Sequence, residues 1–444
     1  MFLPDSVKAC LDRLEGAGFA AYVVGGCVRD ACLGLVPGDY DMCTSALPEE
    51  TESLFSDHRL VLAGKKHGTV GVVTADGVIE ITTFRTEGDY RDNRHPEWVK
   101  FVPHIADDLA RRDFTVNAMA YSPIRGYADP FGGQGDLEQK VLRAVGDPQT
   151  RFQEDALRIL RGVRFAIRYG LNVEQKTMDA MLSLRGLMDN LARERIYEEL
   201  SKLLPLVSAA DLIRFAPIFA AVIPELEDCI GFDQRNPHHT HDVYGHTAHV
   251  VARVSPDLTL RWAALLHDVG KPHTFSLDKT GRGHFYGHAK ESASLADKIL
   301  LRLKAPTVLR QQTVRLIEQH MTPLTPDRKL LRRRLSALGS ESLYQLLQLQ
   351  EADWSGKGTD EVRENGEFSE IRRILSEIEA ENACLSLKDL GVNGHDLMAA
   401  GITGPAIGRT LNQLLALVLD EQLPNEKSAL LTAAHHFNNQ EESQ

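Results

Sequence analysis

The sequence contains no long apolar run and no paired cysteines, and each absence removes a class of protein. No stretch of the 444 residues approaches the roughly 20 apolar residues of a membrane-spanning helix, so we expect no membrane span. The six cysteines are scattered without a CxxC pair, which argues against a disulfide framework or a zinc knuckle. The first fifteen residues include acidic ones and no cleavage site follows, so we expect a cytoplasmic protein without a signal peptide.

An excess of positive charge is also missing. The formal net charge is −12 at pH 7, whereas phosphate binding requires lysine and arginine. Net charge is an average over the whole molecule, and basic surfaces can coexist with an acidic remainder. Composition therefore leaves nucleic-acid binding open. The hydrophobic share of 43% and the charged share of 25% are those of a globular protein.

The sequence pattern changes from mixed α/β to helical near residue 145. Two β-rich runs, GTVGVVT and VIEITTF, flank Ala75-Asp76-Gly77, which predicts a hairpin. From about residue 150 the apolar spacing is helical almost to the end. A proline- and histidine-rich stretch near residue 231 and a later polar stretch indicate further boundaries. The predicted segments are a small mixed α/β head at 1–145, a helical neck at 146–230, a helical domain at 231–360 and a helical tail at 361–444.

The head carries two acidic residues shortly after a glycine pair. Gly25 and Gly26 lie between a predicted strand and a predicted helix that contains Arg29, so backbone N–H groups and a guanidinium can approach a triphosphate. If the segment is a strand, Asp39 and Asp41 point to the same face. Two oxygen ligands side by side suit Mg²⁺, which also binds substrate phosphates. The pattern predicts activation of an attacking hydroxyl and stabilisation of leaving pyrophosphate.

A second cluster, ARRDFTVNA, follows in the head. We expect Arg112 to reach ribose or phosphate, and Asp113 and Asn117 to brace the loop. Glu80, on the predicted strand VIEITTF, is either a third carboxylate of the site or an ordinary solvent-facing strand residue.

The segment RFQEDALRILRGVRFAIR predicts a helix that reads bases. Asp155, Arg158, Arg161 and Arg164 recur at helical spacing along one side. Cytosine and adenine each present an amine donor beside a ring-nitrogen acceptor, so Asp155 can accept from the amine while Arg158 donates to the ring. Uracil and guanine present the opposite pattern. The pair therefore predicts selection of C and A without a nucleic-acid template.

GGCVRD with DYD, RRDFTVNA and EDALRILRGVRFA stand in the order found in class II tRNA nucleotidyltransferases, a group that includes bacterial poly(A) polymerases. The chain resembles that family, and LARERIYEEL and GITGPAIGRTLNQLLALVLDEQLPN resemble its neck and its tRNA-holding tail. The resemblance implies addition or repair of the 3′-terminal CCA of tRNA from CTP and ATP. It implies Asp39 and Asp41 as metal ligands. It implies a nucleotide site made of Gly26, Arg29, Arg112, Asp155, Arg158, Arg161 and Arg164.

Members of the family differ in product, and the sequence leaves two alternatives open: addition of A only, or poly(A) synthesis. Enzymes that add only CC lack a flexible loop between the first two motifs, and residues 85–101 fill that place here. CC-only activity is therefore not expected. The implied partners are tRNA, ATP and CTP, with no membrane and no obligate protein partner evident.

Residues 238–353 contain a second constellation. His246, the adjacent His267 and Asp268, and Asp353 resemble the H…HD…D pattern of the HD metal-dependent phosphohydrolases, and LLHDVGKP is a specific match. The resemblance implies a phosphohydrolase domain in which a metal activates water. Mixed imidazole and carboxylate ligands favour a transition metal such as Mn²⁺, Co²⁺ or Ni²⁺.

Three further residues of this constellation have open roles. His288 and His320 occupy places that hold a second metal in some relatives. Lys271 either steadies a phosphate or is a surface lysine. Two whole-protein alternatives also stay open: an HD phosphohydrolase with a non-catalytic RNA-binding head, and an RNA chaperone without catalysis.

Overall fold

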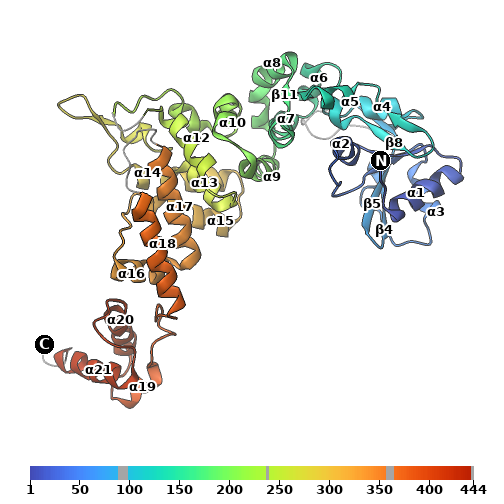
Figure 1. The fold of residues 1–444 in the computed structure, drawn as a ribbon. Helices are drawn as coiled ribbons and strands as arrows, with labels where there is room; N and C mark the ends of the chain where they lie inside the picture. Colours follow the sequence, from blue (N-terminus) through green and yellow to red (C-terminus); the bar gives the residue numbers. More distant parts are fainter. Residues whose placement is uncertain (89–98, 237–239, 357–364, 442–444) are drawn as a thin grey trace. The chain divides into compact units, whose positions relative to one another are not determined.

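The computed structural model describes residues 1–88, 99–236, 240–356 and 365–441. They form two compact units, Met1–Glu227 with Arg302–Lys304 and Asp228–Leu301 with Ala305–Gln444 (Figure 1). The four predicted segments are a finer division than these two units and stay a prediction. Among the described helices, none is both long and apolar enough to cross a membrane.

The first unit is built on a seven-stranded mixed sheet of order β3-β4-β5-β2-β1-β8-β9. Its strands are β1 Ala21–Val24, β2 Met42–Thr44, β3 Leu60–Val61, β4 Thr69–Thr74, β5 Gly77–Thr83, β8 Ala120–Ser122 and β9 Gly126–Ala128. β1 is antiparallel to β2 and β8, and β2 is parallel to β5. The predicted hairpin is confirmed, because Thr74 pairs with Gly77 across a two-residue turn.

Helices surround this sheet and continue beyond it, which confirms an α/β head followed by helical structure. The helices of the first unit are α1 Asp5–Gly16, α2 Gly26–Cys32, α3 Pro48–Leu54, α4 Ile105–Ala110, α5 Gly133–Glu138, α6 Pro148–Glu154, α7 Leu157–Tyr169, α8 Gln175–Leu184, α9 Arg193–Leu203, α10 Ala209–Arg214 and α11 Ala216–Val222. A buried cluster that includes Tyr22, Phe84, Leu109 and Val145 joins strands, α4 and the segment before α6 into one core.

Short strand pairs complete the first unit. β10 Val141–Leu142 pairs with β11 Asn172–Val173 in parallel, and β6 Arg85–Glu87 pairs with β7 Val99–Phe101 antiparallel. The loop that argued against CC-only activity runs between β6 and β7, and its residues 89–98 lie outside the described part of the chain.

The prediction that Asp39 and Asp41 lie within a strand is wrong. β2 begins at Met42, immediately after them. The backbone oxygen of Asp41 nevertheless accepts a hydrogen bond from the backbone nitrogen of Val24 at 2.9 Å. The segment is thus held in line with β1 by this bond, although it does not form a regular strand.

The prediction of one continuous helix from Asp155 to Arg164 is also wrong. α6 ends at Glu154, and Asp155 has an extended backbone with φ −143° and ψ 103°. Its Oδ1 accepts from the backbone nitrogen of Leu157 at 3.1 Å, which satisfies a free donor at the start of α7. Asp155 therefore lies at the break between two helices, and only the three arginines lie on α7.

The second unit is almost entirely helical. Its helices are α12 Val243–Arg253, α13 Leu258–Leu266, α14 His288–Arg302, α15 Thr307–Gln319, α16 Arg328–Leu338, α17 Ser340–Gly356, α18 Asn365–Ala380, α19 Gly394–Ala399, α20 Pro405–Leu419 and α21 Lys427–Glu441. α12 packs against α13 and α17, and α13 packs against α15 around the fully buried Trp262. A short hairpin of β12 Ser276–Leu277 and β13 Gly283–His284 precedes α14.

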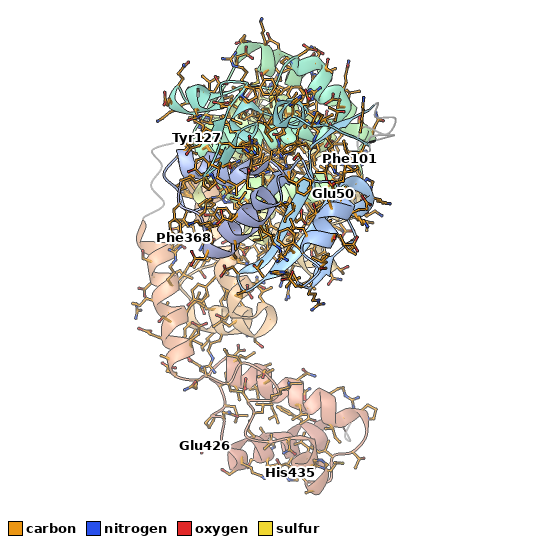
Figure 2. All side chains as sticks on the ribbon, turned by 90° about the vertical axis from the view of Figure 1, so that its right-hand side faces the viewer. Glu50, Phe101, Tyr127, Phe368, Glu426 and His435 are labelled. Carbon is orange, nitrogen blue, oxygen red and sulfur yellow. The ribbon has the colours of Figure 1, made fainter. Side chains whose placement is uncertain are left out.

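The last three helices have a core of their own. Leu397, Leu414 and Leu430, one from each helix, are fully buried together. In Figure 2, Glu426 and His435 lie in this part of the chain, immediately before α21 and within it. This packing joins α19, α20 and α21 into one small helical body.

Candidate nucleotide and metal sites

A cavity of about 970 Å³ lies in the first unit, and the predicted head residues converge on it. It is lined by Gly25, Gly26, Arg29, Asp39, Asp41, Arg112, Asp113, Asn117, Arg161 and Phe165. Both acidic residues, the glycine pair and three of the predicted arginines therefore share one site. Asp155, Arg158 and Arg164 are not among the lining residues.

Gly25 permits the close approach of chain and guanidinium that this cavity requires. Its φ is +77°, in the region that favours glycine. A Cβ added there would lie 2.9 Å from Nη1 of Arg112. A side chain at position 25 would therefore displace Arg112 from the cavity wall.

Arg29 is positioned by contacts from three elements. Its Nη1 donates to Oδ1 of Asn117 at 2.6 Å, and its Nε donates to Oδ1 of Asp30 at 2.9 Å. Its Nη2 donates to the hydroxyl of Tyr169, and the guanidinium carbon lies 4.3 Å from the centre of that ring. Arg29 is only 6% exposed, so the guanidinium is fixed before any ligand binds. Sequence reasoning missed Tyr169, whose only signal was an aromatic residue at the end of a basic helix.

Asp113 is the buried anchor of the loop, as predicted. Its Oδ1 accepts from the backbone nitrogen of Phe114 at 2.8 Å and from Nδ2 of Asn117 at 3.1 Å. Its Oδ2 accepts from Nε and Nη2 of Arg161 at 2.9 and 2.7 Å. Burial raises the pKa of Asp113, but the Arg161 charge and these hydrogen bonds outweigh it and lower that pKa to about 2. The pair fixes α7 against the loop in ionised form.

The acidic pair is electrostatically suited to a cation. The pKa of Asp41 is raised first by burial, then by the negative charges of Asp39 and Glu80. Its side chain is still accessible to solvent, so an ion can reach it. Three carboxylates that repel one another, with oxygen as the only donor atom, fit a hard divalent cation. Glu80 therefore contributes charge to the site, although it does not line the cavity.

The two predicted base-reading residues are engaged with protein partners. Oδ2 of Asp155 accepts from Nη2 of Arg195 at 2.8 Å. Nη1 of Arg158 donates to Oε2 of Glu154 at 2.6 Å, and its Nη2 donates to the backbone oxygen of Arg111 at 3.0 Å. Both would have to exchange these partners to contact a base, so their role stays a prediction.

Phe165 is a cavity residue that the sequence analysis did not single out. The guanidinium carbons of Arg29, Arg161 and Arg164 lie 5.3, 5.2 and 4.5 Å from the centre of its ring. Nε of Arg164 also donates to Glu199 of α9, and Arg164 is buried. One aromatic ring thus gathers three positive charges beside the acidic pair.

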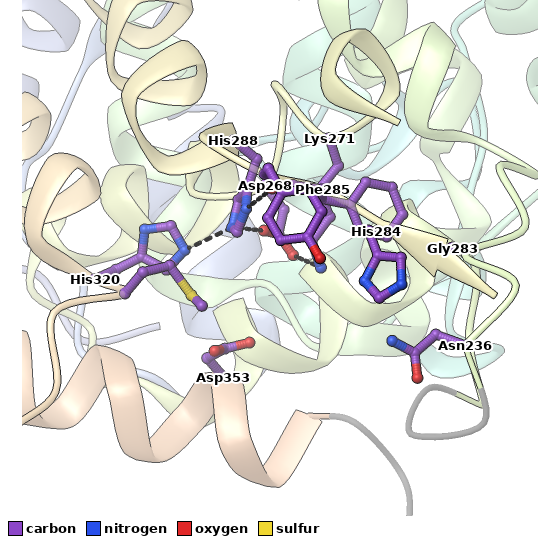
Figure 3. A pocket seen from close by; sticks show the side chains of 11 residues that line it. Asn236, Asp268, Lys271, Gly283, His284, Phe285, His288, His320 and Asp353 are labelled. Carbon is purple, nitrogen blue, oxygen red and sulfur yellow. Dashed lines mark hydrogen bonds and ion pairs between the residues drawn. The ribbon is translucent and has the colours of Figure 1, made fainter. Parts of the chain in front are cut away.

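The second unit contains the predicted histidine–aspartate constellation beside a cavity of about 620 Å³ (Figure 3). Nε2 of His246 lies 2.9 Å from Oδ1 of Asp353 and 3.5 Å from Oδ2 of Asp268. Nε2 of His267 lies 3.1 Å from that same Asp268 oxygen and 3.8 Å from Oδ1 of Asp353. The four residues come from α12, α17 and the turn after α13, and their ligand atoms lie within 4.8 Å of one another.

A second group shares Asp268. Its Oδ1 lies 3.4 Å from Nε2 of His288, and Nε2 of His288 lies 3.2 Å from Nε2 of His320. Figure 3 shows His288 and His320 on one side of Asp268. One carboxylate therefore lies between two sets of imidazoles, one facing each oxygen.

Backbone contacts orient three of these rings. In His267, His288 and His320, Nδ1 lies 2.8, 2.8 and 2.6 Å from the carbonyl of the residue three positions earlier. A carbonyl only accepts, so Nδ1 carries the proton and Nε2 is left as the ligand atom. Nε2 faces the shared carboxylate in His267 and His288, and in His320 it faces Nε2 of His288. The lone pairs of His288 and His320 would then repel each other unless a cation lies between them.

The charges of the cluster fit a metal. Burial lowers the pKa of His267, but Asp268 and Asp353 outweigh it and raise that pKa to about 10. Both carboxyl groups have pKa values well below the ordinary range, since the positive charges beside them outweigh the effect of burial. The buried carboxylate of Asp268 and the half-buried one of Asp353 thus require positive charge, which a divalent ion can supply in place of the proton.

Lys271 is part of this site rather than a surface residue. It is only 5% exposed. Its Nζ lies 2.7 Å from Oδ2 of Asp268 and donates to Oε1 of Gln234 at 3.0 Å. Gln234, itself 2% exposed, was not singled out from the sequence because an isolated glutamine in a polar stretch carries no signal.

Three family models match parts of the chain. Residues 21–143 match the poly A polymerase head domain, and residues 170–229 match a probable RNA- and SrmB-binding site of polymerase A. Residues 287–434 match a putative tRNA nucleotidyltransferase domain 2. These matches, together with the acidic cavity, define a nucleotidyltransferase of the polymerase A type.

Whole-chain comparisons narrow this class. The chain is 33% identical to the CCA-adding enzyme of Bacillus velezensis over 95% of this chain and 96% of that protein. It is 34% identical to the CCA-adding enzyme of Levilactobacillus brevis over 97% of each. The chain belongs to the family of CCA-adding enzymes, which are tRNA nucleotidyltransferases. Nucleotidyltransferases of this family use a divalent metal ion.

Solved structures agree with this assignment. The CCA-adding enzyme of Bacillus stearothermophilus in complex with CTP superimposes with a TM-score of 0.73 at 25% identity, over the whole of both chains. The Thermotoga maritima enzyme complexed with tRNA has a TM-score of 0.60 at 21% identity, over 98% of this chain and 96% of that one. At 21% identity, the likeness to the Thermotoga maritima enzyme shows a shared fold.

The raised pKa of Asp41 makes a prediction about stability. Because the pKa of this carboxyl is higher in the folded chain than in the unfolded chain, its ionisation lowers the free energy of unfolding. This loss is present at neutral pH and absent at acidic pH, where the carboxyl is protonated in both states. Asp41→Asn removes the charge and should raise the Tm of the metal-free protein at pH 7 by about 1–2 °C. Millimolar Mg²⁺ should raise the Tm of the wild type but not that of the variant, as scanning calorimetry would show.

The matched control is Asp76→Asn, in the exposed turn between β4 and β5, which should leave both the Tm and its response to Mg²⁺ unchanged. A lower Tm for Asp41→Asn without metal, or an equal Mg²⁺ response in both proteins, would contradict a cation site at the acidic pair.

Proposed function

We propose that this chain adds or repairs the 3′-terminal CCA of tRNA, using CTP and ATP without a nucleic-acid template and releasing pyrophosphate. The observation that carries the proposal is the convergence of Asp39 and Asp41 with Arg29 and Arg112 in one cavity. Family membership supports it, as do solved relatives described as complexes with CTP, with ATP and with tRNA.

Asp39 and Asp41 would hold the divalent ion, and Mg²⁺ suits their oxygen donors. When bound, such an ion neutralises charge that develops on the triphosphate. Arg29, fixed by Asp30, Asn117 and Tyr169, has one Nη1 hydrogen left for a phosphate oxygen. Arg112 lies against Gly25, where phosphate or ribose would pass. The tRNA hydroxyl gives its proton to water and its oxygen joins the α-phosphorus. The bond between the α-phosphorus and the oxygen that bridges to the β-phosphate breaks, and pyrophosphate leaves.

Selection of the base would fall to Asp155 and Arg158. Asp155 lies at the α6–α7 break and would have to leave Arg195 to contact a base. Arg161 and Arg164 would hold the same helix in place through Asp113 and Glu199. Addition of A alone or of poly(A) by the same site are the alternative products.

The remaining assignments complete the proposal. In chain order the segments would be the head at 1–145, the neck at 146–230, the domain at 231–360 and the tail at 361–444. The tail would contact tRNA. The protein would work in the cytoplasm.

The second unit supports a second candidate function, metal-dependent phosphohydrolysis. The observation that favours it is the pair of ligand groups on either side of Asp268. His246, His267, Asp268 and Asp353 would hold one transition-metal ion, Mn²⁺, Co²⁺ or Ni²⁺. Such an ion makes water more acidic and neutralises phosphate charge. Lys271, buried against Asp268, would bind a phosphate oxygen.

Replacing the acidic residues tests the main proposal. Asp39→Ala or Asp41→Ala should lower nucleotide addition at least about 1,000-fold, because a metal supplies several kcal/mol of charge stabilisation in the transition state. Filter binding should show that tRNA affinity is kept. The control is Asp12→Ala, exposed on α1 and expected to keep full activity. Near-wild-type addition by either site variant would sink the assignment.

The base-reading hypothesis predicts loss of selectivity as well as rate. Asp155→Ala or Arg158→Ala should reduce discrimination against UTP and GTP about tenfold or more, since a charge-assisted base contact contributes roughly 1–3 kcal/mol. Single-nucleotide incorporation assays measure the ratio. Arg168→Ala, exposed on the same helix α7, is the control that should keep strict selectivity. A site variant that stays strictly specific for C and A would mean that the base is read elsewhere.

The two candidate activities should be separable, because no ligand is shared between Asp39/Asp41 and the histidine set. His267→Ala and, independently, Asp353→Ala should remove phosphomonoester or phosphodiester hydrolysis with Mn²⁺, Co²⁺ or Ni²⁺. Both variants should retain CCA addition with Mg²⁺ within about twofold. Circular dichroism would establish that each variant is folded. If the wild-type protein hydrolyses no substrate with any of these metals, the second candidate function is wrong. If a folded variant loses both hydrolysis and CCA addition, the two sites are coupled.

A further inference from the structure

The helix α16 is strongly basic, and its arginines bind other parts of the second unit. Its sequence, RKLLRRRLSAL, contains five basic residues and no acidic one. A basic helix in an RNA enzyme usually indicates contact with phosphates. Here α16 packs against α18 and α20 (Figure 1), and its arginines pair with carboxylates that directly follow those two helices. Much of the charge of α16 is therefore used in contacts within the unit.

Arg328 joins the end of α18 to the end of α20. Its Nε donates to Oε1 of Glu421 at 2.9 Å, and its Nη2 donates to the carboxylate of Glu381. Glu381 comes directly after α18, where the chain enters the last three helices, and Glu421 lies just beyond α20. One guanidinium thus fixes the entrance to the small helical body of α19, α20 and α21, here called the tail body.

Arg332 attaches α16 to the core of the tail body. It is only 8% exposed. Its Nη2 donates to the backbone oxygen of Val418 at 3.2 Å, and its Nη1 donates to Oε1 of Glu421 at 3.3 Å. Val418 belongs to the last turn of α20, where a positive charge is favourable. Its side chain is buried with Leu397 and Leu430 in the core of the tail body.

Arg333 adds a bidentate pair with the residue that ends α20. Its Nε donates to Oδ1 of Asp420 at 2.5 Å, and its Nη2 donates to Oδ2. An isolated surface ion pair contributes little to stability, whereas bidentate pairs within a network contribute more. Three guanidinium groups and three carboxylates are joined here: Arg328, Arg332 and Arg333 with Glu381, Asp420 and Glu421. We call this set the α16 network.

The backbone of Glu421 indicates that its side chain is needed. Its φ is +57°, in the left-handed region where glycine is the usual residue at a helix end. A glutamate is strained there, but it supplies a carboxylate that glycine lacks, and that carboxylate binds both Arg328 and Arg332. In addition, one family model matches residues 287–434, which include both α16 and most of the tail body. Both observations favour a contact that is built into the unit.

We propose that the arginines of the α16 network are positioning residues for tRNA, which hold the tail body in one place so that it meets tRNA already in its binding position. The inference rests on the proposed function, in which the tail contacts tRNA. A tail body that moved freely would have to be fixed on binding, at a cost in conformational entropy that weakens the affinity. The network removes this cost beforehand. Because Asp39 and Asp41 lie in the other unit, the network acts on KM for tRNA and not on the chemical step.

Charge reversal across the pair of Arg333 and Asp420 tests the proposal. The full chain is assayed with Mg²⁺, CTP and ATP on tRNA that lacks CCA, and on a short hairpin that carries only its acceptor stem. Arg333→Asp and Asp420→Arg should each raise KM for tRNA about fivefold and keep kcat within about twofold. The double variant restores an opposite-charge pair and should return KM to within about twofold of the wild type. KM for the hairpin should stay unchanged throughout.

Arg373→Asp is the matched control, because Arg373 is exposed and pairs with Glu370 and Glu377 of its own helix α18. It should leave KM for tRNA unchanged. Where circular dichroism shows that a charge reversal fails to fold, Arg333→Gln and Asp420→Asn replace it, each with a rise in KM of about twofold. An unchanged KM in the folded single variants, or no rescue in the double variant, would overturn the proposal. A rise in Arg333→Asp with a fall in Asp420→Arg would show that α16 binds RNA directly, which also overturns it.

Trypsin separates failure of the network from failure of the proposed function. Lys388 is exposed between α18 and α19, and cleavage after it requires the chain there to open locally. Each single reversal should speed this cleavage about threefold or more, and the double variant should restore the wild-type rate. If the wild type has the same KM for tRNA and hairpin, the proposed contact between tail and tRNA is wrong, and cleavage still tests the network. Equal cleavage in all four proteins would mean that the network does not hold the tail body.

Discussion

The buried carboxylate of Asp113 connects the parts of the nucleotide site. One oxygen holds Arg161 of α7 and the other holds Asn117, which in turn holds Arg29. Arg29 also donates a hydrogen bond to the hydroxyl of Tyr169 at the end of α7, so the network begins and ends on the same helix. Because the carboxyl is buried, its charge is stable only while Arg161 neutralises it, and each partner is correspondingly fixed. Arg29, which is proposed to bind phosphate, and the basic helix α7 are therefore placed by one ionic network.

The two candidate sites solve opposite electrostatic problems. In the head, Asp39, Asp41 and Glu80 repel one another, and the neighbouring arginines are oriented by other partners, so the negative charge is left for an incoming cation. In the second unit, imidazoles lie beside Asp268 and Asp353, and backbone carbonyls orient three of them, His267, His288 and His320. Oxygen-only ligands suit Mg²⁺ and mixed ligands suit transition metals, so one chain can hold both without exchange between sites.

The sequence predicted much of which residues lie together, because these residues belong to short motifs. The glycine pair and the acidic pair lie in one cavity, and the residues of the HD motif lie in one cluster with the other predicted histidines and aspartates. Reasoning failed where backbone breaks decide position. Asp39 and Asp41 precede β2, and Asp155 starts a new helix by bonding to Leu157, which spacing alone does not reveal.

Residues defined by long-range contacts were also beyond the sequence. Phe165 looks like any apolar residue of a helix, yet three guanidinium groups surround its ring. Tyr169 and Gln234 take their roles from partners more than 30 positions away. The sequence alone does not distinguish a surface lysine from a phosphate-binding one at position 271, and the burial of Lys271 excludes the surface role. Such roles depend on the folded arrangement, and no local pattern encodes them.

The central claim is template-independent CCA addition, and trimmed tRNAs test it most directly. Purified protein would be incubated with Mg²⁺ and tRNAs that lack A, CA or CCA, with CTP alone, ATP alone or both, and the products would be sequenced. The account predicts that each tRNA is extended to CCA and no further, with C added only where C is missing. Extension by A alone regardless of the end supplied, continued addition of A, or no extension at all would contradict it.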